Sequence, residues 1–185
     1  MDWQALLENC SSCHKCALGD TRTNVVFGAG QKNASLLFVG EAPGEAEDLS
    51  GVPFVGRAGQ LLNSFLDEAG IARDKVYIAN ILKCRPPENR DPSPAEEEAC
   101  RPWLEAQIRL IDPRVIVCLG RISAARLIKP DFRITKEHGV WFEREGRLIT
   151  AVYHPAYLLR DPRKRPDFKA DLKRIYDQLQ QTEQS

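Results

Sequence analysis

The stretch of sequence that most constrains the fold runs from residue 36 to residue 59 and joins an apolar run to a loop rich in glycine. Residues 36–39 are apolar enough to form a short buried strand, and Gly40-Glu41-Ala42-Pro43-Gly44 ends that strand. Glycine allows backbone conformations that other residues avoid, and it lets a ligand approach the main chain. Ligands of open α/β sheets bind at the carboxyl ends of the strands. The sequence therefore predicts a pocket whose floor is this loop.

The composition of the loop favours a pocket over a plain connection. Five glycines fall between residues 40 and 59, and no Gly-Lys-Ser/Thr or G-x-G-x-x-G pattern marks a phosphate or dinucleotide site. The loop also holds two prolines, three carboxylates and one aromatic residue: Pro43, Pro53, Glu45, Glu47, Asp48 and Phe54. A long glycine turn between a strand and a helix is the alternative, but these residues exceed what a connection needs.

Apolar runs alternate with segments of helical periodicity along the rest of the chain. The sequence predicts further strands over residues 24–30, 76–80, 115–120, 141–142 and 148–153. It predicts helices over residues 3–9, 58–69, 93–111, 122–128 and 168–179, with a kink or restart at Pro102. Such alternation is typical of a parallel sheet with helices on both faces. The 185 residues are expected to form one domain, residues 1–185, with residues 180–185 frayed.

Charge and hydropathy limit how the protein could contact nucleic acid or a membrane. The 26 basic and 26 acidic residues cancel, so any nucleic-acid contact must come from a local basic surface. No apolar run is long enough to span a bilayer, and polar residues interrupt the start of the chain. We expect a soluble, intracellular protein of cytoplasmic location with no membrane partner. The six cysteines of such a protein indicate metal binding or catalysis in preference to disulfides.

The cysteines near the amino terminus are spaced for metal binding. Cys10, Cys13 and Cys16 follow one another at three-residue intervals, so either neighbouring pair forms a Cys-x-x-Cys in which two thiolates can bind one metal centre. A redox pair, or incidental cysteines, would give the same spacing. Cys84 lies in an irregular segment and Cys100 in the helix predicted over 93–111. Four thiolates suit zinc or an iron–sulfur centre, and the spacing does not choose between them. Cys118 is predicted to be an ordinary buried thiol.

Two further strands end in polar side chains. Asn80 follows the strand at 76–80 and His154 follows the strand at 148–153. Each could be structural, Asn80 as a turn cap and His154 as a strand-end histidine. If the strands are parallel, however, both side chains meet the loop at residues 40–44 along one edge of the sheet.

Four motifs in this order resemble the uracil-DNA glycosylase superfamily, and in particular its family 4 enzymes, which carry an iron–sulfur cluster. The similarity extends from about residue 13 to about residue 172. It implies a three-layer α/β/α fold with a central, mainly parallel, four-stranded sheet. The motifs are Gly40-Glu41-Ala42-Pro43-Gly44, Pro53-Phe54-Val55-Gly56-Arg57-Ala58-Gly59, Asn80 with Lys83-Cys84-Arg85-Pro86-Pro87, and His154-Pro155-Ala156-Tyr157-Leu158-Leu159-Arg160.

The resemblance implies that the protein flips uracil out of DNA and hydrolyses its N-glycosidic bond, which leaves an abasic site in base excision repair. Phe54 would stack on the base, and the Asn80 amide would pair with O4 and N3–H of uracil. Cytosine would leave that amide mismatched. Backbone N–H groups of Gly40–Ala42 would bind O2, and His154 would donate to the same oxygen as charge accumulates on the leaving base.

The group that activates water is open. The best-known family of the superfamily has an aspartate where this chain has Ala42, so Glu41 and Glu47 are the candidate carboxylates for orienting water or balancing the sugar cation. Glu41 could instead hold the loop in shape. We expect electrostatic stabilisation to dominate, with no strong base required.

The resemblance also implies a [4Fe–4S] cluster with a structural role, held by Cys13, Cys16, Cys84 and Cys100. Cys10 complicates this assignment, because Cys10 and Cys13 could form the pair instead. DNA contacts would come from cationic side chains and from a wedge after His154 that fills the gap left by the base. The residues predicted to contact DNA are Arg57, Arg85, Tyr157, Leu158 and Arg160.

Uracil-containing DNA, double- or single-stranded, is the expected partner of a monomeric enzyme, with a sliding clamp or other repair proteins as further partners. Two alternatives are an iron–sulfur protein that binds uracil-DNA with weak or no turnover and a variant that traps DNA covalently. The trapping variant needs a histidine soon after the strand at 76–80, and this chain has none between His14 and His138.

Overall fold

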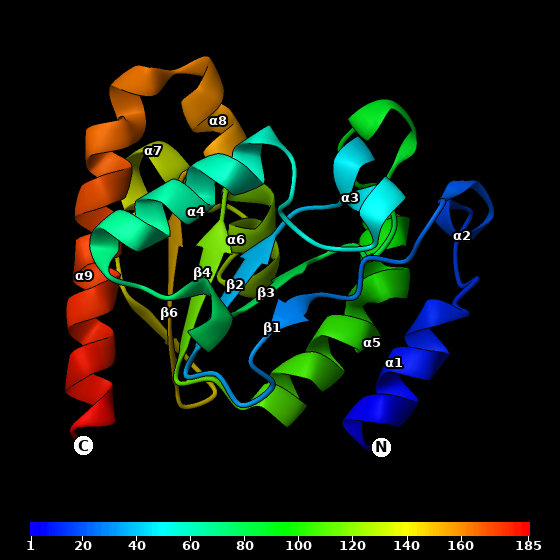
Figure 1. The fold of residues 1–185 in the computed structure, drawn as a ribbon, viewed down its shortest axis with the longest axis horizontal. Coiled ribbons are helices and arrows are strands. Elements are labelled where there is room, and N and C mark those ends of the chain that lie inside the picture. Colours follow the sequence, from blue (N-terminus) through cyan, green and yellow to red (C-terminus); the bar gives the residue numbers. More distant parts are fainter.

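A computed structural model, which describes residues 1–185, shows an α/β protein built around one six-stranded sheet (Figure 1). The order of the strands across the sheet is β1-β3-β2-β4-β6-β5. The strands are β1 (Ala29–Gly30), β2 (Leu36–Gly40), β3 (Tyr77–Asn80), β4 (Val115–Leu119), β5 (Phe142–Arg144) and β6 (Arg147–Val152). The α/β class and the alternation of strands with helices are as the sequence predicts.

The four-stranded sheet that the resemblance implied forms the centre of the sheet, and two short edge strands extend it to six. The central strands β3, β2, β4 and β6 are parallel, and they are flanked by β1 and β5, which are antiparallel. The strand β1 is a two-residue pairing. The strands β5 and β6 form a hairpin whose turn residues, Glu145 and Gly146, both have positive φ angles, 51° and 77°. Two such residues match the right-handed twist of a tight hairpin.

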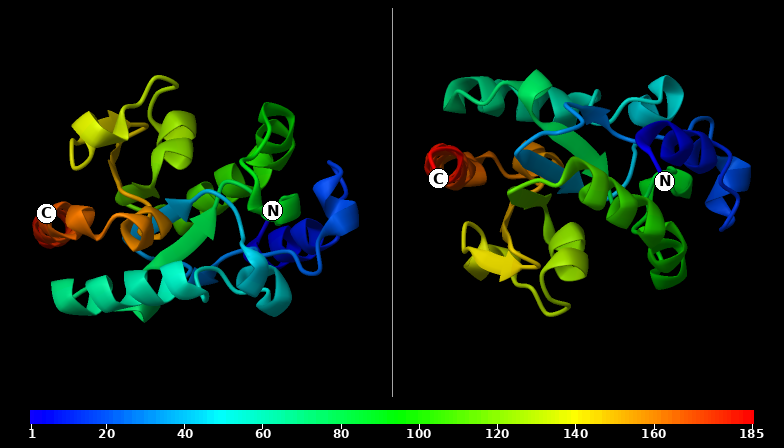
Figure 2. Two further views of the ribbon diagram at one scale, coloured as in Figure 1. Left: turned by 90° about the horizontal axis from the view of Figure 1, so that it is seen from above. Right: turned by 90° about the horizontal axis from the view of Figure 1, so that it is seen from below.

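Helices cover both faces of this sheet (Figure 2). The main helices are α1 (Trp3–Ser11), α4 (Arg57–Ala69), α5 (Pro94–Ile111), α6 (Arg121–Leu127) and α9 (Arg165–Glu183). The shorter ones are α2 (Leu18–Thr21), α3 (Glu45–Ser50), α7 (Ile134–Glu137), α8 (Pro155–Arg160), η1 (Arg73–Lys75), η2 (Pro87–Asn89) and η3 (Pro162–Lys164). None of these helices combines the length with the apolar composition that a membrane span requires.

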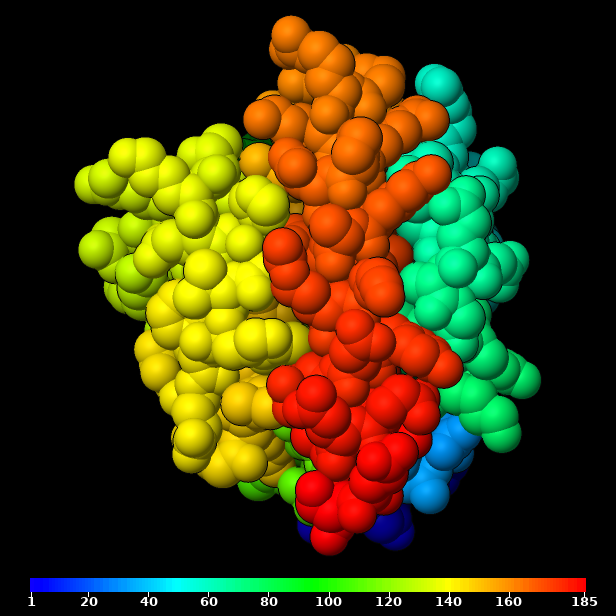
Figure 3. Space-filling model, turned by 90° about the vertical axis from the view of Figure 1, so that its left-hand side faces the viewer, coloured from blue at the N-terminus to red at the C-terminus, as the bar shows by residue number.

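Alternate residues of the central strands feed two separate cores. Phe38 and Val117 face a core that α4, α8 and α9 complete, whereas Leu37 and Ile116 face a core completed by α1, α5 and α6. Successive side chains of a strand point to opposite faces, so a fully buried parallel strand needs both faces apolar. Figure 3 shows α9 lying between α4 and the segment that contains α7 and β5.

The helix does not restart at Pro102, one of the two outcomes that the sequence predicted there. The helix α5 is continuous from Pro94 to Ile111, and its start has the predicted capping box, with Ser93 and Glu96 bonded to each other's main chain. Pro102 and Glu98, one turn earlier, are both exposed. The carbonyl that Pro102 leaves without a helical partner therefore faces solvent, where water satisfies it at little cost.

Candidate functional site

The carboxyl ends of the parallel strands open into a cavity of about 590 Å³ at the upper edge of the sheet in Figure 1. Its walls come from the loops after β2, β3 and β6 and from the start of α4. These strand ends are far apart in the sequence, yet the parallel pairing brings them to one edge, as the sequence predicts. The predicted site residues that line the cavity are Glu41, Ala42, Glu47, Phe54, Arg57, Asn80, His154 and Arg160.

Gly40 and Asn80 pair in register at the ends of β2 and β3. A Cβ added to Gly40 would lie 2.4 Å from Oδ1 of Asn80 and 2.6 Å from the ring of Phe54. Only glycine leaves room for the amide and the ring to approach each other here. Asn80 is 2% exposed, and its Oδ1 is buried with no hydrogen-bond partner. A buried acceptor left unpaired is costly unless a ligand meets it.

Phe54 occupies a strained backbone conformation that the surrounding loop holds in place. Its φ angle is +53°, a left-handed conformation uncommon for an aromatic residue. Gly59 packs directly beneath it, since a Cβ there would lie 1.9 Å from the carbonyl oxygen of Phe54. The ring centroid of Phe54 is 5.7 Å from that of His154, with 31° between the ring planes. The stacking residue and the imidazole therefore form neighbouring walls of one cavity.

Glu47 holds this loop by its carboxylate. Oε1 accepts from the N–H of Gly44 (3.1 Å), and Oε2 accepts from the N–H groups of Val55 (3.0 Å) and Gly56 (2.7 Å). The carboxylate thus ties the start of α3 to the approach to α4. The loop-holding role that the sequence suggested for Glu41 is filled by Glu47.

Arg73 holds the same loop from the opposite side, and no motif in the sequence pointed to it. Its guanidinium donates to the carbonyls of Phe54 (3.0 Å) and Pro53 (2.7 Å) and to Oδ1 of Asn63 (2.5 Å). Arg73 lies in η1, which precedes β3. Its distance from the loop along the chain is why the sequence alone gave no signal of this contact.

His154 is the N-cap of α8, and this contact determines which ring nitrogen carries the proton. Nδ1 accepts from the N–H of Ala156 at 3.0 Å, so a neutral ring carries its proton on Nε2. Burial, followed by the charge of Arg160, lowers the pKa of His154 to about 4. Near neutral pH His154 is therefore an uncharged imidazole with Nε2–H as its donor.

Glu41 is the carboxylate of the cavity whose protonation is most perturbed. Burial, together with the neighbouring Asp91, raises its pKa to about 7, and Arg121 opposes that shift. No hydrogen bond ties its carboxylate to the loop as Glu47 is tied. Near neutral pH Glu41 is divided between its charged and neutral forms.

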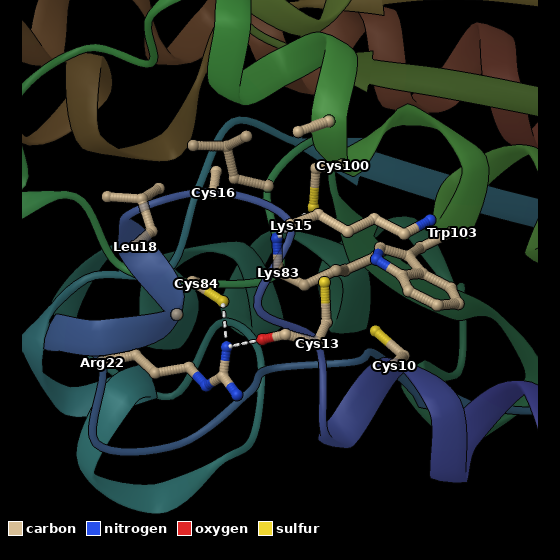
Figure 4. Close-up of a pocket in the computed structure, with 13 residues that line it drawn as sticks. Cys10, Cys13, Lys15, Cys16, Leu18, Arg22, Lys83, Cys84, Cys100 and Trp103 are labelled. Carbon is tan, nitrogen blue, oxygen red and sulfur yellow. Dashed lines mark hydrogen bonds between the residues drawn. The ribbon is translucent and has the colours of Figure 1, made fainter.

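A second, smaller cavity lies between the amino-terminal segment, the chain after β3 and α5 (Figure 4). Five of the six cysteines line it: Cys10, Cys13, Cys16, Cys84 and Cys100. Figure 4 shows the sulfurs of Cys10, Cys13, Cys84 and Cys100 turned toward the same space. No group of three or more His, Cys, Asp or Glu side chains is arranged to hold a metal ion. Cys118 is buried in β4, as predicted.

The charge of Lys83 fits a thiolate-bound centre in this cysteine cavity. Lys83 is 1% exposed, and its ammonium donates to the carbonyl of Asn80 at 3.0 Å. The ionisable groups that face it are the thiols of Cys100, Cys10 and Cys84. A buried ammonium needs compensating negative charge, and neutral thiols supply none. Thiolates bound to a metal centre would supply it.

Comparison with known proteins agrees with this geometry. The family model for the Uracil DNA glycosylase superfamily matches residues 27–180. This chain belongs to that superfamily. A type-4 uracil-DNA glycosylase of Archaeoglobus fulgidus is 48% identical over 172 residues, which cover 89% of this chain and 86% of that relative. The type-4 enzyme of Thermotoga maritima is 47% identical over 158 residues (83% and 81%). A type-5 enzyme of Thermus thermophilus is 30% identical over 192 residues (83% and 87%).

The residues predicted to contact DNA divide into those at the rim of the cavity and those away from it. Arg57 and Arg160 are exposed at the rim. Arg85 does not line the cavity, but its Nε donates to Asn89, which does. Tyr157 is half-buried and stacks on Tyr153 with ring centroids 5.4 Å apart. Only some of the side chains of α8 therefore lie at the cavity.

Leu158 is the exception among these predictions. It is 0% exposed and packs into the core beneath α8, because the segment after His154 is helical and turns this side chain inward. A contact between Leu158 and DNA does not fit this position.

Proposed function

We propose that this protein excises uracil from DNA by hydrolysing the N-glycosidic bond, which releases free uracil and leaves an abasic site as the first step of base excision repair. One observation carries the proposal: Phe54, Asn80 and His154, from distant parts of the chain, line one cavity at the end of the sheet. Membership of the superfamily supports it. The target base must leave the helix stack to enter such a cavity.

Recognition of uracil rests on Asn80 and Phe54. The amide of Asn80 accepts from N3–H of uracil through the unpaired Oδ1 and donates to O4 through its NH₂ group. Cytosine presents a bare N3 and an amino group at these positions, so the same amide is left mismatched in a buried site. Phe54 supplies a flat apolar face for the ring of the flipped base.

Departure of the base rests on His154. Its Nε2–H donates to O2 of uracil, and the backbone N–H groups of Gly40–Ala42 point to the same oxygen in this proposal. Negative charge accumulates on that oxygen as the bond to the sugar breaks. Donors fixed in place before the reaction stabilise such charge without reorganisation. A neutral imidazole suits this role because its N–H is retained across the physiological range.

The two carboxylates, Glu41 and Glu47, lie on the side of the sugar in this proposal. The hydrogen bonds from Gly44, Val55 and Gly56 hold the carboxylate of Glu47 in place, where it balances the oxocarbenium-like cation. Glu41 has no such ties and can orient the water that attacks the sugar. Ala42 offers only a methyl group where an aspartate would do this work.

We also propose that Cys13, Cys16, Cys84 and Cys100 hold a [4Fe–4S] cluster. The buried ammonium of Lys83 supports an anionic centre in the cysteine cavity. The cluster would join the amino-terminal segment to the chain after β3 and to α5, which is a structural role. Cys10 faces the same cavity and remains the alternative partner of Cys13.

DNA binding would rest on the arginines at the rim, with Tyr157 beside the cavity and the cationic side chain of Arg85 further out. Affinity should then fall steeply with salt concentration, because phosphate contacts release counterions. We expect the protein to act as a monomer in the cytoplasm, and we propose a sliding clamp or other repair protein as a further partner.

The test is incubation with an oligonucleotide that carries a single uracil, alongside matched oligonucleotides with cytosine or thymine at that position. Abasic product from the uracil strand alone supports the proposal. A DNA adduct that survives denaturation would indicate covalent trapping instead. Binding without product or adduct would indicate a recognition protein that lacks turnover, and either result would overturn the proposal.

A further inference from the structure

A buried aspartate of α9 and the histidine that follows α7 form a hydrogen-bonded pair with no part in the proposed chemistry. The side chain of Asp171 is 0% exposed, and its Oδ2 lies 2.7 Å from Nδ1 of His138. A carboxylate only accepts, so Nδ1 of His138 carries the proton. The other oxygen of Asp171 accepts from the exposed Arg174 at 2.8 Å. Since burying a carboxylate is costly, its place inside the protein needs a reason.

The turn after His138 is shaped to receive this carboxylate. Gly139 has a φ angle of +76°, in the left-handed region that favours glycine. A Cβ added to Gly139 would lie 2.3 Å from Oδ1 of Asp171, so a larger residue would also displace the carboxylate. The N–H of Gly139 donates to the carbonyl of Ala151 in β6 at 2.8 Å. The pair therefore joins α9 and the turn after α7 to the last residues of β6.

The ring of His138 packs against the residue that follows β6. Its centroid lies 4.9 Å from that of Tyr153, with 34° between the ring planes. The ring of Tyr153 also stacks on Tyr157 of α8, with centroids 5.4 Å apart and 26° between the planes. Tyr153 is 2% exposed and is the middle member of this run of rings. Its position therefore depends on the ring of His138, which Asp171 holds in place.

Tyr153 directly precedes His154, and the two side chains serve different regions. Tyr153 belongs to the core that α4, α8 and α9 complete, whereas His154 lines the cavity at the sheet edge. His154 has extended φ and ψ angles of −67° and 136°. Successive side chains of an extended chain point to opposite sides. A shift of the Tyr153 ring on one side would therefore turn the ring of His154 on the other.

We infer that His138 and Tyr153 are positioning residues for His154: the buried Asp171 fixes the ring of His138, this ring packs on Tyr153, and Tyr153 determines where Nε2–H of His154 lies in the cavity. This inference rests on the proposed function and deepens it. A catalytic group displaced by about 1 Å can slow a reaction by about a hundredfold, so a buried support for the donor has a clear use.

Three variants test the contacts one by one. Tyr153→Leu removes the middle ring, whereas Tyr153→Phe keeps the ring and loses only the hydroxyl. His138→Ala removes both the ring against Tyr153 and the hydrogen bond to Asp171. The side chain of His138 is 20% exposed, so His138→Ala is expected to fold even if Tyr153→Leu does not.

Two matched controls leave these contacts intact. Phe142→Leu removes an aromatic ring from the neighbouring edge strand β5, where it packs on Phe132 with centroids 6.1 Å apart. Arg174→Gln removes the exposed donor to Asp171 while the donor from His138 stays. Both controls should excise uracil at the wild-type rate.

The measurements are the single-turnover rate of uracil release and the affinity for uracil-containing DNA. We expect Tyr153→Leu and His138→Ala to slow release about tenfold with unchanged DNA affinity, because the donor is misplaced while the binding surface is kept. Tyr153→Phe should recover most of the rate. With His154→Ala in the same chain, neither variant should slow release any further, since residues that act through one group are not additive.

A spectroscopic readout follows His154 without turnover. The chain has three histidines, so the ring signals of His154 in an NMR spectrum can be assigned by their loss in His154→Ala. These signals should move in His138→Ala and stay in place in Phe142→Leu.

Equal slowing with and without the ring of His154 would overturn the inference, and so would wild-type rates in the folded His138 and Tyr153 variants. Unmoved His154 signals in His138→Ala would also overturn it. Excision by the wild type tests the proposed function separately, and the NMR comparison needs no activity, so the two failures are distinguishable.

Discussion

The cavity at the sheet edge and the cysteine cavity lie side by side along the end of β3, yet their side chains are held in place in different ways. The first is fixed by the protein itself: Glu47 and Arg73 bond to its loop from two sides, and the N-cap of α8 orients His154. In the second, few hydrogen bonds reach a sulfur, among them those from Arg22 and Lys83. The first is therefore pre-organised, whereas the second depends on what its thiols bind.

This difference predicts that substitutions at the two cavities have separable effects. Substitutions at the sheet edge should reduce uracil excision without loss of iron. Substitutions of the thiols should first cause loss of iron. Each prediction that follows tests whether the two effects can be separated.

The largest loss of activity is expected from His154→Ala. Removing a donor that stabilises charge on the leaving group should slow excision on the order of a hundredfold or more. Iron content should be unchanged. The measurement is the single-turnover rate of uracil release. His154→Asn is the control, because asparagine is a good N-cap and keeps the start of α8. If His154→Asn matches the wild-type rate, the helix cap and not the donor is what His154 supplies.

The sequence predicted the cavity at the sheet edge well, because the ends of strands follow from simple sequence patterns. Apolar runs located the parallel strands, and their parallel order placed Asn80, His154 and the loop at 40–44 at one edge. Apolar runs also predicted strands over residues 24–30 and 141–142, where the structure has the short edge strands β1 and β5, although the family resemblance implied only four strands. Leu158 was misassigned because only the turn of α8 decides which side chains face inward.

The contacts by which Arg73 and Glu47 hold the loop could not be predicted from the sequence, for a different reason. Arg73 contacts the loop 19 and 20 residues earlier in the chain through carbonyl oxygens, which carry no sequence signature. The sequence identified Glu47 as a candidate carboxylate of the site. The three main-chain N–H groups that donate to it could not be predicted, because they depend on the conformation of the loop. The spacing of Cys10, Cys13 and Cys16 could not choose a pair, and all three line the cysteine cavity.

A smaller loss is expected from Glu41→Gln, and it should depend on pH. The pKa of Glu41 is raised to about 7, so the wild type gains the charged form as pH rises through 7. The wild-type single-turnover rate should rise over that interval and the variant's rate should stay flat. At pH 8 we expect a difference of roughly tenfold to a hundredfold, well below the ~10⁴-fold upper end of what a general base supplies.

Glu47→Gln is the comparison for this test. Glutamine has one acceptor oxygen in place of two, so this variant should also lose thermal stability, which Glu41→Gln should not. A loss of about 10⁴-fold or more in either variant would contradict the expectation that electrostatic stabilisation dominates.

A loss of about tenfold is expected from Arg73→Gln, since the strained Phe54 loses a charged hydrogen bond to its carbonyl. The measurement is the excision rate in a double-mutant cycle with Phe54→Leu. If Arg73 acts by positioning Phe54, the two effects should be strongly non-additive. Arg109→Gln, an exposed arginine on α5, is the control for loss of charge alone. Additive effects would mean that Arg73 contributes only to stability.

The smallest effect is expected from Cys10→Ala, which should keep both iron and activity, whereas Cys16→Ala should lose iron. Both thiols line the cysteine cavity, but Cys10 is fully buried in α1 and Cys16 lies half-exposed at its edge. Iron content and visible absorption of the purified variants distinguish them, and stoichiometric zinc in the wild type would refute the cluster. The reverse outcome, iron lost with Cys10 and kept without Cys16, would make Cys10 and Cys13 the ligand pair.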